Sequence, residues 1–593
     1  MSKRQFHWAI TIFVGTVIII GGIGLLIWQA FWPHIQQWSF GGNNRVVPFH
    51  EHHNVDPEIP NLISDRELWR QSDAPQPFIE DEVIYLPIEF IRQTGLDQFI
   101  FWDSYASVLF VTTRDDVLSF NLNQTRFYLN GAPQPLTHPI RRVGDDIFIP
   151  ASLAEALYPL SVTHYSYYNL IVVENLSLPR TTAELTHRTD IRYREASNSP
   201  IAVRAPSGST VVVFEEVGDF TRVRSEEGLL GWALTSALGE RETIVPLETL
   251  EREPLLGSFV NNHVHHPPNW PTGRPVVMAW DSIYVQAANA VMMENPLDES
   301  LTVISPMWFR LDEETMTITS LASREYVLWA QAQGVQVWPF VFDVFYNHSH
   351  AILTNQEARQ RVINTLVQYV DDLGLDGINI GFEHVRPADG VYLIQFLREL
   401  APLLRQRGAV LSTNVLVPRP YTQFYRRDLM AYTVDFIIIM AYDEHWSSAP
   451  TSGPVASMPF VQRSIEDSLL QVPRGQLVLG VPFYNRLWRE VIGDNRVETR
   501  QTRHFGTGYT RAWFDYHDVE WEWLPDVGKY FAYFPAMDDG VPVQWLVWLE
   551  CERSIALKLQ AALGYQLAGV SVWNRNFRHN EELWEVMGRY FGN

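Results

Sequence analysis

The C-terminal part of the chain alternates between short apolar runs and amphipathic stretches. Eight apolar runs have the length and flanking turn residues of buried strands, and helical stretches such as residues 355–373 and 552–563 separate several of them. The runs are residues 275–285, 302–312, 335–345, 375–385, 409–418, 435–446, 477–488 and 568–576. This order predicts a (β/α)₈ barrel, and the long gap between the last two runs leaves room for an inserted lobe.

The fourth run, LDGINIGFEHV, carries a candidate chemical group. Side chains alternate along a strand, so Asn379, Gly381 and Glu383 share one face while apolar residues occupy the other. A carboxylate at the end of such a strand is typical of a barrel with a site at its C-terminal mouth. A surface strand whose Glu383 meets water is the alternative, and the apolar opposite face disfavours it.

Two further patterns lie in the N-terminal half. Residues 83–93 and 146–157 each combine a strand, a proline that opens a helix and an amphipathic turn, which predicts a small α+β domain. Short strands dominate from about residue 183 to 241. The polar residues 36–75, which include His50, His52 and His53, predict a solvated linker, with a histidine metal site as the alternative.

The N-terminus predicts a membrane anchor. Lys3 and Arg4 precede an uncharged apolar run of 21 residues, Trp8–Trp28, which as a helix would span a bilayer core of about 30 Å. A secretory signal is the alternative, but its apolar region usually has about 7–15 residues and ends in small residues. With the positive flank inside, everything beyond about residue 35 is expected outside the cell, on a single-pass anchor.

The composition limits the classes of possible binding partners. The formal charge of −23 over 593 residues argues against nucleic acid and against an anionic membrane surface as partners. The 21 Trp and 24 Tyr would suit sugar-binding platforms, although most are expected to pack in cores. The single cysteine, Cys551, excludes an internal disulfide and a cysteine-based metal site, and we expect no cofactor and no metal.

The stretch at residues 375–385 resembles the signature of glycoside hydrolase family 18, the chitinase-like family, whose fourth barrel strand carries D-G-x-D-x-D-x-E. Asp376, Gly377 and Glu383 match this signature. Asn379 stands at the second acidic position, a change similar to that in relatives that cut peptidoglycan in bacterial spores and cell walls. Gly381 replaces the third acid, which in the family grips the substrate's acetamido group and shares a proton with the catalytic glutamate.

Four other segments carry the same resemblance in family order: SPMWFRLD, MAYDEHW, GVPFYNRLW and GVSVW. The resemblance places Tyr442 and Asp443 at the N-acetyl group of the substrate and Trp573 on the floor beneath the reacting sugar. It therefore implies Glu383 as the catalytic residue and Asn379, Tyr442, Asp443 and Trp573 as substrate-binding residues.

The family implies a substrate-assisted reaction. Glu383 would protonate the glycosidic oxygen while the substrate's 2-acetamido carbonyl attacks the anomeric carbon, and Glu383 would then activate water as a base. Loss of one preorganised group such as the missing aspartate costs on the order of 10²–10³ in rate in other enzymes. An aspartate introduced at Gly381 is expected to raise turnover if neighbouring side chains leave room.

Two resemblances cover the N-terminal half. Residues 76–176 resemble the stalk domain at the N-terminus of copper amine oxidases, without a copper ligand cluster. Residues 183–245, with Gly231 and Trp232, resemble a bacterial Src-homology-3-like domain, which is either a rigid spacer or a binder of peptidoglycan peptides. The expected multidomain order is a cytoplasmic tip with a transmembrane helix (1–35), a linker (36–75), a small α+β stalk domain (76–176), a small β-barrel (183–245) and a (β/α)₈ TIM barrel (255–593).

Two main function classes are open. The first is a surface-anchored hydrolase of N-acetylglucosamine-containing glycan, with peptidoglycan as the expected partner and Asp443 as a candidate substitute for the missing acid. The second is a non-catalytic glycan-binding module, and a purely structural envelope protein is a third option. Gly381 favours the binding module. The hydrolase is favoured by retention of four residues: Glu383, Tyr442, Asp443 and Trp573. We expect the hydrolase; the sequence does not indicate an oligomeric state.

Overall fold

The computed structural model describes residues 44–69, 75–94, 99–246, 270–271, 273–491 and 503–592. The chain divides into two compact units, residues 1–100, 122–125 and 136–259, and residues 101–121, 126–135 and 260–593. The expected membrane helix at residues 8–28 lies outside the described residues. Within the described ranges, no helix has both the length and the apolar character needed to cross a bilayer.

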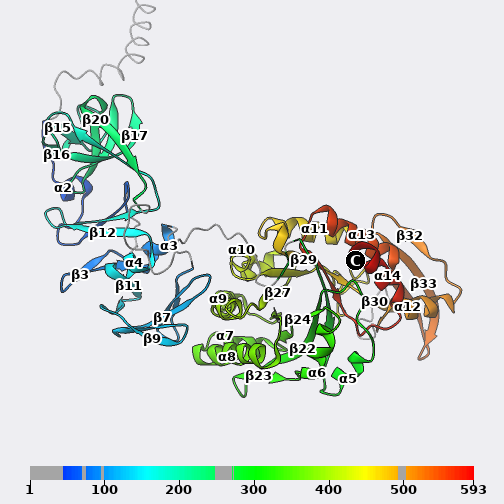
Figure 1. Cartoon of the computed structure of the whole chain (residues 1–593). Coiled ribbons are helices and arrows are strands. Elements are labelled where there is room, and N and C mark those ends of the chain that lie inside the picture. The colour runs from blue at the N-terminus through cyan, green and yellow to red at the C-terminus, as the bar shows by residue number, and fades with distance from the viewer. Residues whose placement is uncertain are drawn as a thin grey trace, which may run out of the picture. The chain divides into compact units, whose positions relative to one another are not determined.

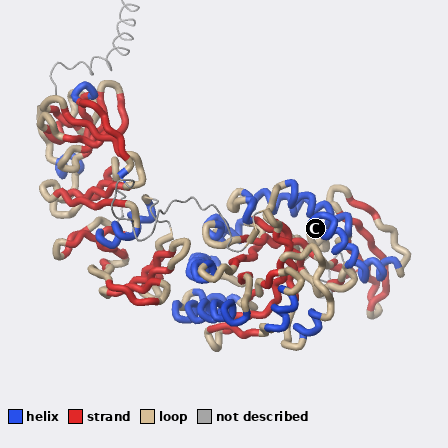
Figure 2. The backbone as a smooth tube through the Cα atoms, viewed as in Figure 1, coloured by secondary structure: helices blue, strands red, loops and turns tan. Residues whose placement is uncertain are grey.

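Strands predominate over helices in the first unit (Figure 2). Two four-stranded sheets have the orders β12-β13-β1-β2 and β10-β11-β4-β3. Their elements are β1 (Asn61–Ser64), β2 (Glu67–Leu68), β3 (Phe78–Glu80), β4 (Val83–Pro87), α3 (Ile88–Gln93), β10 (Arg141–Val143), β11 (Asp146–Pro150), α4 (Ala151–Leu157), β12 (Leu160–Tyr165) and β13 (Leu170–Asn175). The two copies of the strand–helix repeat pair with each other, because β4 lies antiparallel to β11. Pro87 and Pro150 end these strands and cap the helices that follow.

The prediction of a solvated linker is wrong for residues 44–69. Strand β1 pairs in parallel with β13, and Leu62 and Ile63 are fully buried. The three histidines lie within the short helix α2 (Phe49–His53). The ring of His52 stacks on that of Tyr193, with 3.6 Å between the ring centroids. The apolar run in β1 is too short to be recognised as a strand on its own. Its partner strand lies more than 100 residues further along the chain, so no neighbouring pattern reveals the pairing.

A seven-stranded antiparallel sheet completes the first unit, in the order β16-β15-β19-β18-β17-β14-β20. Its strands are β14 (Arg180–Leu185), β15 (Thr189–Arg192), β16 (Ile201–Ala205), β17 (Thr210–Val217), β18 (Phe220–Arg224), β19 (Leu230–Leu234) and β20 (Leu238–Ile244). Ile191, Val211 and Val223 lie in its core. Gly231 allows β19 to approach β15 closely, since a Cβ there would lie 2.5 Å from Ile191 Cγ2. The resemblance to a Src-homology-3-like domain stays a prediction.

The second unit contains a closed parallel barrel of eight strands, as predicted (Figure 1). The strands are β21 (Val276–Asp281), β22 (Val303–Asp312), β25 (Phe340–Phe342), β26 (Gly377–Gly381), β27 (Val410–Leu416), β28 (Phe436–Met440), β29 (Leu477–Pro482) and β35 (Gly569–Trp573). Closure follows because β21 pairs with both β22 and β35. The short β24 (Gln336–Val337) and β23 (Thr317–Ser320) pair with β22.

Helices cover the outside of the barrel (Figures 1 and 2). They are α5 (Ala288–Met293), α6 (Arg324–Gln331), α7 (Tyr346–Leu353), α8 (Gln356–Leu373), α9 (Gly390–Arg405), α10 (Arg427–Ala431), α11 (Met458–Leu469), α13 (Glu552–Gly564) and α14 (Glu581–Phe591). Each strand therefore buries both faces. Residues such as Ile378 and Ile380 pack outward against the helices, whereas Trp280, Trp338 and Phe340 fill the interior.

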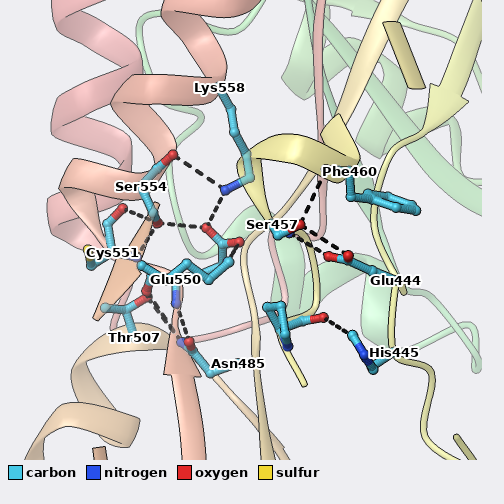
Figure 3. Close-up of polar contacts among 12 residues, drawn as sticks. Glu444, His445, Ser457, Phe460, Asn485, Thr507, Glu550, Cys551, Ser554 and Lys558 are labelled. Carbon is cyan, nitrogen blue, oxygen red and sulfur yellow. Dashed lines mark hydrogen bonds and ion pairs between the residues drawn. The ribbon is translucent and has the colours of Figure 1, made fainter. Parts of the chain in front are cut away.

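The expected lobe occupies the interval between β29 and β35. It has a five-stranded sheet of order β31-β30-β34-β33-β32 and the helix α12 (Thr507–Asp515). The strands are β30 (Asn485–Val491), β31 (Arg503–Phe505), β32 (Glu522–Leu524), β33 (Lys529–Asp538) and β34 (Val541–Leu549). The buried carboxylate of Glu550 accepts hydrogen bonds from Lys529, from Lys558 at 3.0 Å and from Ser554 at 2.7 Å, and thereby ties the lobe to α13 (Figure 3).

The stalk segment does not form one separate body. Its sheet β5 (Phe101–Asp103), β6 (Val108–Thr112), β7 (Val117–Asn121), β8 (Arg126–Leu129) and β9 (Ala132–Pro135) is grouped with the barrel, which differs from the expected boundary at residue 176. Arg359 on α8 pairs with Asp103 at 3.0 Å, with both side chains fully buried. Arg398 on α9 donates to the carbonyl of Thr112 at 2.6 Å. This docked sheet, β5–β9, is thus part of the barrel unit.

Candidate active site at the barrel mouth

Glu383 follows β26 at the C-terminal end of the barrel and is exposed to solvent there. Its backbone is held from two sides. Asp343, which follows β25, accepts the N–H of Glu383 at 3.0 Å and that of His384 at 2.9 Å. Tyr425 donates its hydroxyl to the carbonyls of Phe382 at 3.1 Å and Glu383 at 3.4 Å. The segment that carries the glutamate is therefore fixed by side chains of neighbouring barrel loops.

The surroundings of Glu383 favour its protonated form. Loss of water around the carboxyl group in the mouth raises the pKa first, and the negative charges of Asp343 and Asp443 raise it further, against an opposing effect of His384. Together they bring the pKa of Glu383 to about 7. The side chain retains contact with solvent, so water can still reach it. A carboxyl group with this pKa can act as an acid and as a base near neutral pH.

Asp443 and Tyr442 lie near Glu383, and their contact with an N-acetyl group stays a prediction. Asp443 has a left-handed backbone, with φ of 55°, and its carboxylate accepts hydrogen bonds from Tyr484 and Arg486. Burial and the charges of Glu383 and Asp443 raise the pKa of Tyr442. The phenol of Tyr442 therefore stays protonated and can donate a hydrogen bond. Asp443 is held by a buried arginine rather than by the catalytic candidate.

The loop that carries Asp443 is itself anchored. The carboxylate of the next residue, Glu444, accepts the N–H of Ser457 at 2.8 Å and its hydroxyl at 3.0 Å (Figure 3). Ser457 caps the N-terminus of α11 by accepting the N–H of Phe460 at 3.3 Å. His445 bonds to the carbonyl of Pro454 at 3.1 Å. These contacts fix the loop before any ligand binds.

Trp573 is half-buried at the end of β35, and its ring lies 5.6 Å from that of Trp280. Trp280 in turn donates its indole N–H to Asn379 at 3.1 Å. The amide of Asn379 also donates to Ser412 at 2.9 Å, and Asn379 is fully buried. Asn379 therefore supports the aromatic floor from below and is not placed to touch a substrate directly, which corrects the role inferred from the signature.

Gly381 has no room for the missing aspartate. A Cβ at this position would lie 2.0 Å from Phe340 Cε2 and 2.6 Å from Asn414 Nδ2. Both neighbours are buried, so a carboxylate would fit only if the ring of Phe340 moved away. The condition under which an aspartate would restore turnover is therefore not met.

Asp376 and Gly377 belong to the opposite end of the strand. Asp376 accepts the N–H of Val337 at 2.9 Å and the amide of Gln331 at 3.0 Å, which joins the start of β26 to its neighbour. Gly377 allows close packing, since a Cβ there would lie 2.7 Å from Trp338 Cδ1. These two signature residues are structural in this chain.

Sequence reasoning missed Asp343, Tyr425 and Arg486 as parts of the site. Asp343 carried the same signal that identified Glu383, an acidic residue directly after an apolar strand run, and could have been found by it. Tyr425 ends a short 3₁₀ helix, Pro420–Tyr425, after β27 and gives no such signal. Arg486 lies within the GVPFYNRLW motif, but its pairing with Asp443 depends on how β29 and β28 meet.

This geometry defines a (β/α)₈-barrel protein with its site at the C-terminal mouth, built around a glutamate of raised pKa, a tyrosine and an ion-paired aspartate. The family model of the glycosyl hydrolases family 18 matches residues 346–577, which lie within the barrel region. Residues 70–163 match the copper amine oxidase N-terminal domain.

Two curated relatives from Bacillus subtilis (strain 168) each match part of the chain. YdhD, which carries the name of a sporulation-specific glycosylase, is 28% identical over 41% of this chain and 56% of its own length. The cortical fragment-lytic enzyme is 26% identical over 37% of this chain and 51% of its own length. The chain thus spans about half the length of these two relatives. Among solved structures, a chitinase from Chromobacterium violaceum ATCC 12472 is 20% identical, with a TM-score of 0.47 over 54% of this chain and 99% of that chain.

Proposed function

We propose that the barrel is a glycosidase acting on glycan that contains N-acetylglucosamine, with Glu383 as both acid and base. The position of Glu383 carries this proposal: it stands at the open mouth, its backbone is fixed by Asp343 and Tyr425, and its pKa is about 7. A group so placed can give up and take back a proton in one catalytic cycle.

The reaction runs with help from the substrate. Glu383 donates its proton to the glycosidic oxygen, and the bond from that oxygen to the anomeric carbon breaks. The carbonyl oxygen of the 2-acetamido group closes on the anomeric carbon and forms an oxazolinium ring. Glu383, now ionised, takes a proton from the incoming water, which opens the ring. Tyr442 donates a hydrogen bond at the acetamido group, and Trp573 stacks beneath the sugar.

Peptidoglycan is the substrate that we propose. The relative named cortical fragment-lytic enzyme supports an envelope glycan over free chitin. Exposed aromatic side chains stand on loops that follow four different barrel strands, where they can contact several sugars of a long chain. They are Tyr284 after β21, Phe345 after β25, Tyr421 after β27 and Trp446 after β28.

The test is release of soluble glycan fragments from purified peptidoglycan, followed by mass spectrometry. Wild type should release fragments and Glu383→Gln should not, because the amide keeps the shape of the carboxyl group but cannot donate its proton. Glu314→Gln is the matched control, since Glu314 is exposed on the turn between β22 and β23. Equal release by wild type and Glu383→Gln would contradict the assigned role.

A second candidate function is a glycan-binding module without catalysis. It is favoured by one observation, the ring of Phe340 in the space next to Gly381, where the family keeps a carboxylate. Such a module would bind N-acetylglucosamine oligomers yet release no product under conditions in which a chitinase of the family does. The peptidoglycan assay, combined with a binding measurement, distinguishes the two candidates.

We also propose that residues 8–28 anchor the protein in the cell membrane as a single span, with the barrel outside. The apolar length of this segment and the positive residues before it support this location.

A further inference from the structure

Asn414 is a buried polar side chain whose oxygen lacks a hydrogen-bond donor in the described structure. It lies on β27, is 2% exposed, and shares the inward face of that strand with Val410 and Ser412. Its side-chain oxygen is buried and accepts no hydrogen bond within the described part of the chain. A buried amide left unpaired costs more than the hydrogen bonds it could make, so such groups are rare without a reason.

The amide stands directly below the catalytic candidate. The register pairs Ile380 with Thr413, so Gly381 and Asn414 are neighbours at the same level of the barrel. The Nδ2 atom of Asn414 lies 2.6 Å from the position of a Cβ on Gly381. Glu383 follows two residues after Gly381 on the same face, about 7 Å further toward the mouth.

The other asparagine on this inward face behaves differently. Asn379, two residues below Gly381, bonds to Trp280 through its oxygen and to Ser412 through its nitrogen. Its oxygen and its nitrogen therefore each have a partner within the protein. Of the two, only Asn414 has a buried side-chain oxygen that accepts no hydrogen bond in the described structure.

We propose that the side-chain amide of Asn414 recognises the N-acetyl group of the substrate. A carboxamide offers one acceptor oxygen and two donor hydrogens, and the secondary amide of an N-acetyl sugar offers a complementary N–H and carbonyl. This inference rests on the proposed function, because it assumes that the sugar reacts at Glu383. It makes Asn414 a specificity-determining residue that takes over the contact for which Gly381 has no side chain.

This assignment gives the neutral amide of Asn414 the contact with the acetamido group that a carboxylate makes in the family. Phe340 leaves no room for a carboxylate at position 381, but the amide on the adjacent strand already reaches the same spot. An amide can orient the acetamido group, although it does not balance the positive charge of the oxazolinium ring. The expected result is strong selection for N-acetylated sugar combined with slow turnover.

The experiment measures selectivity by calorimetry in a Glu383→Gln background, which prevents turnover. The probes are the tetramer of N-acetylglucosamine and the tetramer of glucosamine, and the readout is the ratio of their dissociation constants. Asn414→Leu, which has similar size and no polar atoms, should reduce the preference for the acetylated tetramer by about 10-fold. Its melting temperature should be equal or higher, since a buried amide with an unpaired oxygen is removed.

Ser571 provides a matched control. It is fully buried on β35, and its hydroxyl likewise has no partner in the described structure, but it lies two residues below Trp573. Ser571→Ala should leave the preference unchanged. If Asn414→Leu fails to fold, Asn414→Ala replaces it with the same expected loss of preference.

An unchanged ratio in the folded Asn414 variant would overturn the inference. This outcome is separate from failure of the proposed function, which would show as absence of product from wild-type protein on peptidoglycan. A wild type that cleaves nothing, yet loses its preference on Asn414→Leu, would refute hydrolysis and support the assigned recognition.

Discussion

Phe340 and Gly381 are matched in size, because the ring of one fills the volume that a side chain on the other would take. The ring is 3% exposed and stacks on Phe342 with 5.6 Å between centroids. Any side chain at position 381 therefore competes with a well-packed aromatic group. Phe340 on β25 therefore fills the space that the glycine at this position of the family signature leaves.

Gly381→Asp should destabilise the protein instead of restoring activity. Overpacking and a buried carboxylate should together reduce the free energy of unfolding by about 2–3 kcal/mol. Phe340→Ala, which opens the space, should destabilise on its own, but the double variant should lose less than the sum of both single losses. Urea unfolding of all four proteins measures this coupling. Additive losses would show that the two positions do not compete.

Glu383 should control how activity depends on pH. Because the acid must be protonated, turnover of wild type should fall as the pH rises through about 7. The pKa is raised above its ordinary value of 4.5, so the folded state holds the proton more tightly than the unfolded state. The contribution of Glu383 to wild-type stability therefore falls as the pH rises from 4.5 to 7. Glu383→Gln should match wild type near pH 4 and exceed its stability by about 1 kcal/mol near pH 8, a small gain since water reaches the carboxyl group. Thermal unfolding at both pH values measures the difference; equal stability of the two proteins at pH 8 would show that the pKa is not raised.

Asp343→Asn should act through Glu383. The amide keeps one acceptor for the two N–H groups but removes the negative charge that raises the pKa of Glu383. Turnover should fall by about 10–100-fold, and the loss of activity at high pH should begin at a lower pH. Asp435→Asn is the control. Asp435, just before β28, is also a buried carboxylate that accepts a backbone N–H, that of Leu411 at 2.8 Å. A pH profile that stays in place in Asp343→Asn would contradict the electrostatic role.

Asp103→Asn should destabilise the barrel unit through the docked sheet. Removing one carboxylate weakens the buried site of Arg359, which keeps Glu399 at 3.0 Å as its second partner. We expect a loss of about 2–3 kcal/mol in the free energy of unfolding. Asp371→Asn breaks an exposed pair with Arg407 and should cost less than about 1 kcal/mol. Similar losses for both variants would argue against a buried pair.

The location of the protein can be tested on intact cells. Protease added from outside should digest the barrel, and the remaining fragment with residues 8–28 should sediment with the membrane. A barrel that survives on intact cells but is cut after lysis would reverse the orientation. Mature protein that begins near residue 30 and is free in the medium would replace the anchor by a cleaved signal.

The barrel was predictable because its strands are long apolar runs, and both faces of each strand are buried. Glu383 was predictable because a carboxylate at the end of such a run is chemically out of place. Asp343 likewise follows an apolar run and could have been predicted in the same way. The local sequence pattern therefore predicts those residues whose role follows from the strand in which they lie.

The remaining features depend on partners that are distant in the chain. Strand β1 is recognised only through β13, and the docked sheet only through Arg359 on α8. The motif suggested that Asn379 faces substrate, but Trp280 and Ser412 occupy its amide. The lack of space at Gly381 is equally a property of the assembled barrel, since it arises from Phe340 on another strand.

The docked sheet has a consequence for how this barrel could be inherited or exchanged. The barrel unit is discontinuous in sequence, because Asp103 completes the surroundings of a buried arginine that lies more than 250 residues later. A gene segment encoding only residues 255–593 would carry Arg359 without one of its two carboxylates and Arg398 without the Thr112 carbonyl. Recombination that moves the barrel to a new neighbour is therefore expected to succeed only when residues 101–135 travel with it, or when α8 and α9 first lose these two arginines.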